Sequence, residues 1–275
     1  MDIQTLATRL IPVFVALAVA SILETVIPLR TQSRRLHGRL PTNLALLVIT
    51  LALGMALNFT LALGAAYVAE RELGLLQVLG AGTMVSFFVA ILALDGATYL
   101  AHRLLHQIPW FWRLHLVHHI DGAVDATTAF RQHPIEGVLR FTFIAGTAWL
   151  LGAPPAAVAL YRLFGSLNSV LEHSNIRVPS WLDRLLVTFW VTPHMHKIHH
   201  SREQVETDSN YANLFSFFDR LFGTYTPSSR GTSVAYGIRG YDTAEHQSLA
   251  AVLWLPFRRT IRADRARARI TNTTY

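Results

Sequence analysis

The sequence predicts an all-α fold: a polytopic membrane bundle of about four membrane helices or hairpins, with a helical cap on the cytoplasmic side. Hydrophobic residues make up 52% of the 275 residues and charged residues only 15%, whereas soluble domains carry about 25% charged residues. Long apolar stretches recur through the first two-thirds of the chain, and most histidines gather near the ends of these stretches or in the more polar part that follows.

Four apolar stretches define the predicted bundle. A helix that crosses a bilayer needs about 20 mostly apolar residues, and residues 10–29, 43–69 and 84–101 are close to or above this length. The first stretch lacks a convincing cleavage site, so we expect an anchor that stays in the protein. The fourth, 138–171, is interrupted by Gly152-Ala-Pro154-Pro155, which predicts two shorter helices that enter the membrane as a hairpin.

Arginines beside these stretches predict the orientation. The loop after the first stretch carries Arg30, Arg34, Arg35 and Arg39, whereas the loop after the second has no excess of positive charge. Because positively charged loops stay in the cytoplasm, the N-terminus should lie outside and the histidine-rich segments on the cytoplasmic side. We expect a multi-pass protein, with a bacterial inner membrane as its location.

Composition narrows the possible partners. The absence of cysteine excludes disulfides, thiolate metal sites and thiol catalysis. The formal net charge of +7 comes almost entirely from arginines, since Lys197 is the only lysine. Because these arginines lie beside apolar segments, membrane lipids are expected as partners and nucleic acid is not. A short apolar patch, 250–257, and the basic run 258–269 predict a tail on the membrane surface, or simply a solvated basic end.

Eight histidines form three motifs. The first is His102 and His106, the second is His115, His118 and His119, and the third is His196, His199 and His200. Residues three and four apart share a helix face, so we expect each motif to aim two or three imidazoles at one point. A single pair is as often a chance feature as a ligand pair, but one spacing recurs in two distant motifs. Three motifs supply enough nitrogen ligands for two metal ions.

Other polar residues are candidates for the same site. His173 ends an apolar segment at the same membrane edge and is a candidate ninth ligand. Asp95 and Tyr99 share a helix face with the first motif, with Asp95 too deep to bind the same metal directly and suited to support a neighbouring helix or a ligand. His37 and His246 have no neighbouring histidine or carboxylate in a pattern suited to bind a metal. The full set of candidates to line the site or to bond its ligands is Asp95, Tyr99, Asp125, His133, His194 and Asn210.

The ligand set limits the chemistry. Imidazole suits iron, zinc, copper and nickel. Neither a nucleophile triad nor a phosphate-binding or dinucleotide-binding loop is present, and no motif contains the general base of H-E-x-x-H. Two histidine-bound metals beside a bilayer indicate activation of O2 for attack on a lipid-like substrate. A zinc-dependent membrane lipid hydrolase and a metal-ion transporter remain alternatives, although a transporter would need polar ligands across the bilayer midplane.

Residues 90 to 226 resemble the fatty acid hydroxylase / sterol desaturase superfamily of membrane di-iron oxygenases. The resemblance rests on the three motifs in order and on their surroundings. Those surroundings are Asp95-Gly-Ala-Thr-Tyr99, Trp112-Arg-Leu-His115, Arg131-Gln-His133-Pro134-Ile-Glu136, His173-Ser-Asn, Thr192-Pro-His194-Met-His196 and Asp208-Ser-Asn210-Tyr211 leading to Phe218-Asp219.

The resemblance implies two irons held by the eight motif histidines and His173, with zinc able to replace iron in recombinant protein. It also implies O2-dependent hydroxylation or desaturation of a lipid such as a sterol or a fatty acyl chain. The acyl-hydroxylase branch can carry a further histidine four residues before His173, where this chain has Ser169, so one metal would have fewer protein ligands.

No electron-transfer motif is visible in the sequence, so a separate electron donor of the reductase, ferredoxin or cytochrome type is expected. We expect three regions along the chain: membrane helices over 1–80, a histidine-box catalytic domain over 81–226, and a basic cytoplasmic tail over 227–275.

Overall fold

The computed structural model describes residues 3–31, 38–241 and 243–258, and this part of the chain is helical, with two isolated β-bridges and no strand. The elements are α1 (Ile3–Val26), α2 (Arg39–Glu70), α3 (Leu75–Val78), α4 (Thr83–Gln107), α5 (Pro109–His119), η2 (Ala126–Phe130), α6 (Pro134–Leu151), α7 (Pro155–His173), α8 (Ser180–Leu186), α9 (Pro193–His199), α10 (Gln204–Thr207), α11 (Phe217–Leu221), η3 (Ser228–Arg230), α12 (Ala244–Gln247), α13 (Leu249–Trp254) and η4 (Leu255–Phe257). Arg34, Arg35, His37 and the basic run after Arg258 lie outside the described residues.

Two stretches of the described chain are long and apolar enough to cross a membrane. They are Arg39–Val78, which contains α2 and α3, and Thr83–Gln107, which is α4; Leu10–Val26 is a shorter apolar helix. Large apolar side chains such as Val48, Phe59 and Phe88 are more than half exposed on these helices. Contiguous exposed apolar surface is unusual in a soluble monomer, so these faces suit contact with lipid tails.

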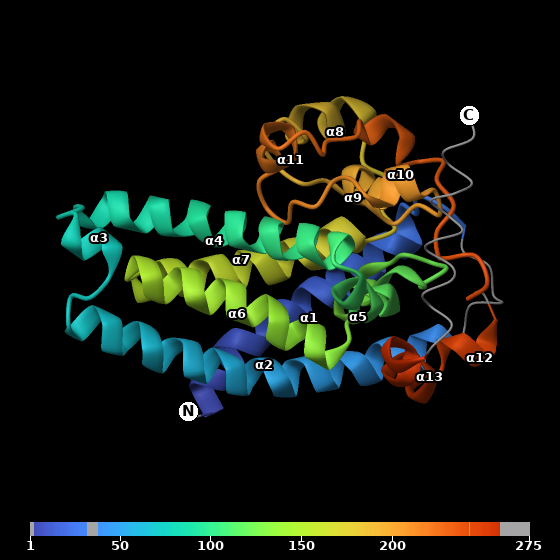
Figure 1. Ribbon diagram of the computed structural model, residues 1–275. Helices are drawn as coiled ribbons and strands as arrows, with labels where there is room; N and C mark the ends of the chain where they lie inside the picture. Colours follow the sequence, from blue (N-terminus) through green and yellow to red (C-terminus); the bar gives the residue numbers. More distant parts are fainter. Residues whose placement is uncertain (1–2, 32–37, 242, 259–275) are drawn as a thin grey trace.

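The predicted break in the fourth apolar stretch is confirmed. Helix α6 ends at Gly152, whose φ of 64° is the left-handed conformation that favours glycine. Helix α7 then begins at Pro155, which suits a first helical position because proline has no N–H to leave unbonded there. The two helices return antiparallel, with α6 lying between α2 and α4 and α7 packing on α1 and α4 (Figure 1).

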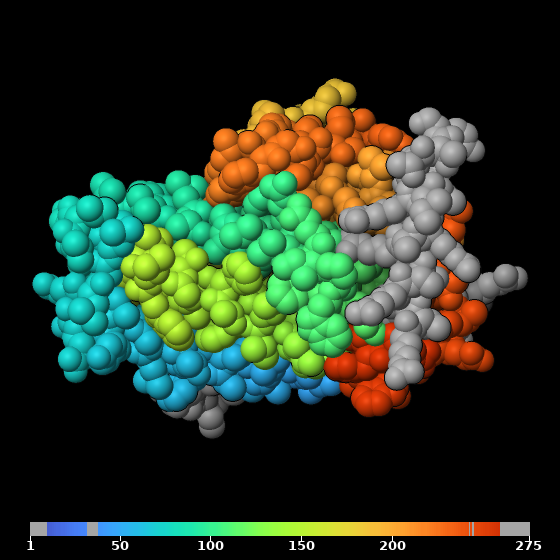
Figure 2. All heavy atoms as spheres, viewed as in Figure 1, coloured from blue at the N-terminus to red at the C-terminus, as the bar shows by residue number. Residues whose placement is uncertain are grey.

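The more polar part of the chain gathers at one end of the bundle. The segments from α8 to η3, here called the cap (residues 175–241), lie beside the ends of α4 and α7 and near α5 (Figures 1 and 2). Asp95 joins the cap to the bundle, because its carboxylate accepts hydrogen bonds from the backbone N–H groups of Leu214 (3.2 Å) and Phe215 (2.9 Å). Asp95 therefore links the middle of α4 to the segment around Leu214 and Phe215.

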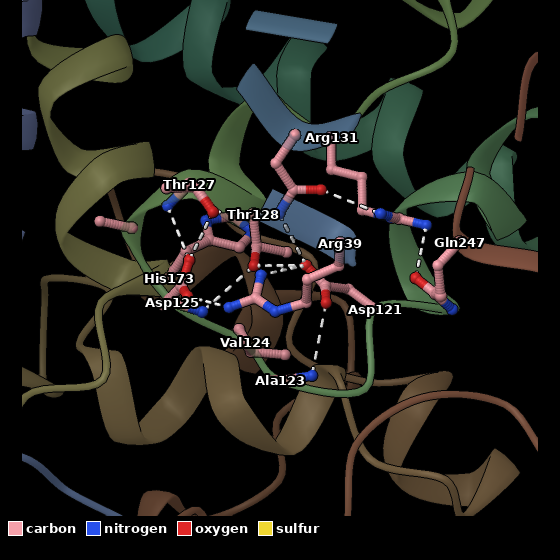
Figure 3. Close-up of polar contacts among 12 residues, drawn as sticks. Arg39, Asp121, Ala123, Val124, Asp125, Thr127, Thr128, Arg131, His173 and Gln247 are labelled. Carbon is pink, nitrogen blue, oxygen red and sulfur yellow. Dashed lines mark hydrogen bonds and ion pairs between the residues drawn. The ribbon is translucent and has the colours of Figure 1, made fainter. Parts of the chain in front are cut away.

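A buried polar network fastens α2 to the turns near α5 (Figure 3). Asp121 accepts hydrogen bonds from Arg39 (3.0 Å) and from Asn43 (3.1 Å). Arg131 donates to the side chains of Asn43 (2.9 Å) and Gln247 (2.9 Å). Each of these side chains is at most 6% exposed, so the charges are paired where water does not reach. The network fixes η2 and the start of α6.

Candidate metal centre

Nine buried histidines converge at the end of the bundle that carries the cap. They form two groups, and within each group one ring nitrogen per residue lies within 4.8 Å of those of the others. No histidine in either group is more than 5% exposed. Cluster A is His102, His106, His115, His119 and His199; cluster B is His118, His173, His196 and His200.

The structure divides the second and third motifs between the two clusters. Two histidines of each of these motifs reach one cluster, and the remaining histidine reaches the other. His118 and His119 are consecutive on α5 and so lie about 100° apart around the helix axis, which directs them to different clusters. His196 and His200 are four residues apart, share a face and reach cluster B together.

Local sequence signals bring the four helices that carry the clustered histidines to this end of the bundle. Helix α4 ends at Gln107, and Pro109 occupies the first position of α5, so the chain turns sharply between the first two motifs. The third motif lies on α9, whose N-cap Thr192 accepts a hydrogen bond from the backbone N–H of Met195. Helix α7 ends at His173.

The outer nitrogen of several rings faces an oxygen that can only accept a hydrogen bond. The Nδ1 atoms of four histidines lie 2.6–3.2 Å from backbone carbonyl oxygens: His102 from Tyr211, His118 from Arg131, His173 from Ser169 and His199 from Ser209. Each of these rings must therefore donate from Nδ1, and in the neutral ring Nε2 is left with a lone pair.

Two carboxylates orient further ligands of cluster A. Glu136 Oε1 lies 2.8 Å from His115 Nδ1 and also accepts from Arg140 Nε at 2.8 Å. Asp208 Oδ1 lies 3.2 Å from His106 Nδ1. A carboxylate on the outer nitrogen fixes the tautomer and raises the basicity of the inner one.

The inner nitrogens face one another. The Nε2 atoms of His102 and His115 are 3.1 Å apart, as are those of His118 and His173. Both rings of each pair already donate from Nδ1, so the two facing nitrogens carry lone pairs that repel unless a cation lies between them. Ligand nitrogens at about 2.0–2.1 Å from one metal are separated by about 3 Å. The donor set therefore fits a metal ion in each cluster.

Burial keeps these imidazoles in the form that binds metal. Desolvation lowers the pKa of all six clustered histidines on α5, on α9 and directly after α9, and lowers that of His118 to about 3. Neutral imidazole is the form that binds metal.

Burial also lowers the pKa of Lys197 to about 7, and its Nζ donates to the carbonyls of Val124 and His173.

Asn210 and Tyr99, two of the candidate supporting residues, contact segments that bond the clustered histidines. Asn210 has a left-handed φ of 55° and joins two segments: its amide donates to the carbonyls of Met195 and Thr226, and its oxygen accepts from Thr226 N–H. The Tyr99 ring packs edge-on against Tyr211. Asn210 thus positions the strip 208–211, which supplies outer acceptors to three ligands of cluster A.

Three other candidates have structural contacts away from the clusters. Asp125 caps η2 and pairs with Arg39. His133 caps α6 by accepting from the backbone N–H of Ile135. His194 lies 3.6 Å from Asp183 and accepts a hydrogen bond from a backbone N–H. These three residues stay outside both groups of nitrogens.

Sequence reasoning missed the carboxylates beside the ligands. Glu136 begins an apolar stretch with Arg140 one turn later, and a buried charged pair in a membrane segment is a signal of function. Glu172 had no such signal; its Oε1 lies 3.7 Å from His173 Nδ1 and 3.9 Å from His196 Nε2. Asp208 lies in one of the segments that carry the family resemblance but was not singled out as a site residue.

A cavity of about 190 Å³ adjoins cluster B inside the bundle. Its wall comes from α2, α4, η2, α6, α7 and Asn213. Ser169 lines it and lies one helical turn before His173, whose Nδ1 donates to the Ser169 carbonyl. The apolar part of the lining includes Leu53, Leu57 and Phe141.

A sequence model of the fatty acid hydroxylase family matches residues 87–224, which is half of the chain and includes all nine histidines of the two clusters. The chain belongs to the fatty acid hydroxylase family. This membership agrees with the resemblance seen in the motifs. No solved structure matches the chain.

Relatives within this family are named for reactions on lipids. Alkylglycerol monooxygenase of Xenopus tropicalis is 30% identical over 155 residues, 56% of this chain and 33% of the relative. An ornithine lipid hydroxylase of Rhizobium tropici is 30% identical over 142 residues, 52% of this chain and 42% of the relative. A very-long-chain aldehyde decarbonylase of Oryza sativa is 31% identical over 144 residues, 51% of this chain and 54% of the relative. The match thus spans only a third to a half of these relatives.

Proposed function

We propose that this member of the fatty acid hydroxylase family is a membrane-bound di-iron oxygenase. It uses O2 and external electrons to hydroxylate an unactivated C–H bond of a lipid. The observation that carries the proposal is the pair of clusters, in which nine buried histidines bring ring nitrogens together at two points. The names of the relatives, a monooxygenase and a hydroxylase among them, support oxidation of a lipid.

The chain's own residues would hold and orient the two metals. Five histidines would bind one iron and four the other, and bound iron would supply the redox chemistry of O2. Glu136 and Asp208 fix the rings of His115 and His106. Burial of every ligand excludes bulk water from the centre, which protects an oxidising site from side reactions.

The substrate chain would lie in the cavity beside cluster B. This cluster has the smaller set of histidines, and Ser169 stands between it and the cavity. An apolar lining from α2 and α6 suits an alkyl chain, and the exposed apolar faces of α2 and α4 would place the entrance within the membrane. The product, an alcohol, an alkene or the fragments of a cleaved ether, depends on which hydrogen lies near the iron.

The topology belongs to the same proposal. Helices α1, α2 and α4 and the α6–α7 hairpin would enter the membrane, with both clusters and the cap in the cytoplasm. The electrons would come from a separate protein, because the absence of cysteine excludes a cysteine-ligated iron–sulfur cluster in this chain.

The test is an oxidation assay with iron-loaded protein in bilayer discs made from a total lipid extract. With isotope-labelled O2 and a reductant, we expect mass spectrometry to find the label in a lipid hydroxyl group. The product should disappear without O2, without reductant, and in the variants His115→Ala and His173→Ala. Lipid hydrolysis that proceeds without O2 and persists with zinc would overturn the proposal in favour of a zinc hydrolase.

A further inference from the structure

The cavity beside cluster B contains two arginines, Arg140 from α6 and Arg162 from α7. We propose that it binds an amphiphile whose anionic group, a carboxylate or a phosphate, is held by Arg162 with Arg140 nearby, while the alkyl chain extends toward the histidines. This inference rests on the proposed function for the fate of the bound molecule, but the binding itself does not depend on it.

Arg162 lies deep inside the bundle. It precedes His173 by 11 residues on α7, so its Cα lies about 16 Å from that of His173 along the helix axis. Its neighbour Tyr161 donates to Asp95, near the middle of α4 (3.3 Å). Its Nε donates to Asn58 Oδ1 (3.1 Å), within the apolar stretch of α2. A guanidinium at this depth is surrounded by membrane helices.

The charge of Arg162 has no acidic partner. Within the described part of the chain, no carboxylate lies within ion-pair distance of it. Arg140 differs, because its Nε is bonded to Glu136, which also holds His115. Charged groups inside a membrane protein are costly and normally face a partner or a cavity. An anionic ligand would supply the missing partner through charge-assisted hydrogen bonds to the planar guanidinium.

The rest of the lining matches the other half of an amphiphile. Leu53, Leu57, Phe141 and Ile144 offer apolar surface along α2 and α6. At the end near cluster B the wall is Ser169 with η2 residues such as Ala129 and Phe130. A wholly apolar molecule would leave the Arg162 charge uncompensated, whereas an anionic chain of sufficient length satisfies both parts of the cavity.

The experiment measures binding of a fluorescent polyene fatty acid, its neutral methyl ester, and the alkyl phosphate of the same chain length. We expect the acid to bind the wild-type protein in discs of neutral lipid at least about tenfold more tightly than the ester. Arg162→Gln should abolish this preference, and Arg162→Lys should retain part of it. Arg184→Gln, on the exposed surface of α8, is the matched control and should bind as the wild type.

The three ligands also decide between the two anions. Tighter binding of the acid than of the phosphate assigns the site to a carboxylate, and the reverse assigns it to a phosphate. Equal binding of acid and ester by the wild-type protein would overturn the inference, and this comparison needs no variant to fold. Unchanged preference in a folded Arg162→Gln protein would overturn it as well.

Measurements on iron-loaded and metal-free protein distinguish this inference from the proposed function. Binding is measured on both the iron-loaded and the metal-free protein, and the preference for the anion should be the same in both because Arg162 is remote from the ligands. Anion-selective binding without O2-dependent product would leave this inference standing while the proposed function fails. Oxidation of neutral lipids that is unaffected by Arg162→Gln would contradict this inference alone.

Discussion

His102 and His115 face each other with their Nε2 atoms 3.1 Å apart, although both rings donate from Nδ1 to oxygen atoms on the opposite side. The same arrangement recurs between His118 and His173 in cluster B. Two lone pairs in contact in a site closed to water are unfavourable without a cation. This relationship makes the metal-binding hypothesis specific: each cluster, rather than each sequence motif, is the unit that holds one metal.

Paired histidine variants test this unit directly. His102 and His119 belong to cluster A, whereas the adjacent His118 belongs to cluster B. We expect the double variant His102→Ala/His119→Ala to retain about one iron per chain and His102→Ala/His118→Ala to retain almost none. Metal content by mass spectrometry decides between them, with His246→Ala, remote from both clusters, as the control. Equal losses in the two double variants would mean that the clusters do not bind metal independently.

Glu136 should control the metal affinity of cluster A. Its replacement by Gln keeps the shape but removes the negative charge that orients His115 and neutralises Arg140. We expect Glu136→Gln to lower the affinity for one of the two metals by about 10- to 100-fold, as measured by competition with a chelator. Cluster B should be unchanged. The control is Glu203→Gln, because Glu203 is exposed and pairs only loosely with Arg239 (3.4 Å).

The sequence predicted those features of the fold and the site that depend on residues close together in the chain. Helical spacing and apolar length predicted the main helices and the break at Gly152, and the motifs with His173 supplied all nine members of the two clusters. The partition between clusters could not be predicted from the motifs, since it depends on how α5 and α9 are rotated in the packed structure.

The oxygen atoms that accept hydrogen bonds from the histidine Nδ1 atoms could not be predicted from the sequence, for a different reason. Tyr211 and Ser169 hold their histidines through backbone carbonyls, which every residue possesses. Likewise, Arg162 and Asn58 are 104 positions apart in the sequence, and nothing in either helix alone marks the pair. Long-range packing, rather than residue type, determines both features.

Asp121 should be essential to stability. It accepts hydrogen bonds from Arg39, Asn43 and Thr128 and is fully buried. Asp121→Ala would leave the Arg39 guanidinium with only Asp125 as an acidic partner. Breaking a buried pair costs about 3–5 kcal/mol, so we expect a large fall in the thermal unfolding temperature in detergent. The exposed pair Glu203–Arg239 provides the comparison.

For that exposed pair, Glu203→Ala should change the stability by less than about 1 kcal/mol, because the two side chains are 64% and 81% exposed and screened by water. Similar effects of the two substitutions would show that the buried network contributes no more than a surface ion pair. Circular dichroism at matched detergent concentration is the measurement for both variants.

Asn210 should couple the backbone conformation of the cap to cluster A. It lies between Ser209 and Tyr211, whose carbonyls accept from His199 and His102. Asn210→Gly removes the side-chain hydrogen bonds but tolerates the left-handed φ of 55°, whereas Asn210→Ala also strains the backbone by about 1–2 kcal/mol. We expect both variants to lower the metal affinity of cluster A, the alanine variant more strongly, and to leave the metal affinity of cluster B unchanged.

The matched control for Asn210 is Glu72, an exposed residue with a φ of 52° in the loop after α2. The variants Glu72→Gly and Glu72→Ala should show the same order of stability, since the backbone strain is the same, but with no effect on either metal. Chelator competition and thermal unfolding on all four variants separate the two contributions. Loss of metal from both clusters in Asn210→Gly would show that Asn210 holds the whole cap rather than the acceptors of one cluster. We expect a selective loss because the Nδ1 atoms of two cluster B histidines, His118 and His173, donate to Arg131 and Ser169, outside the cap.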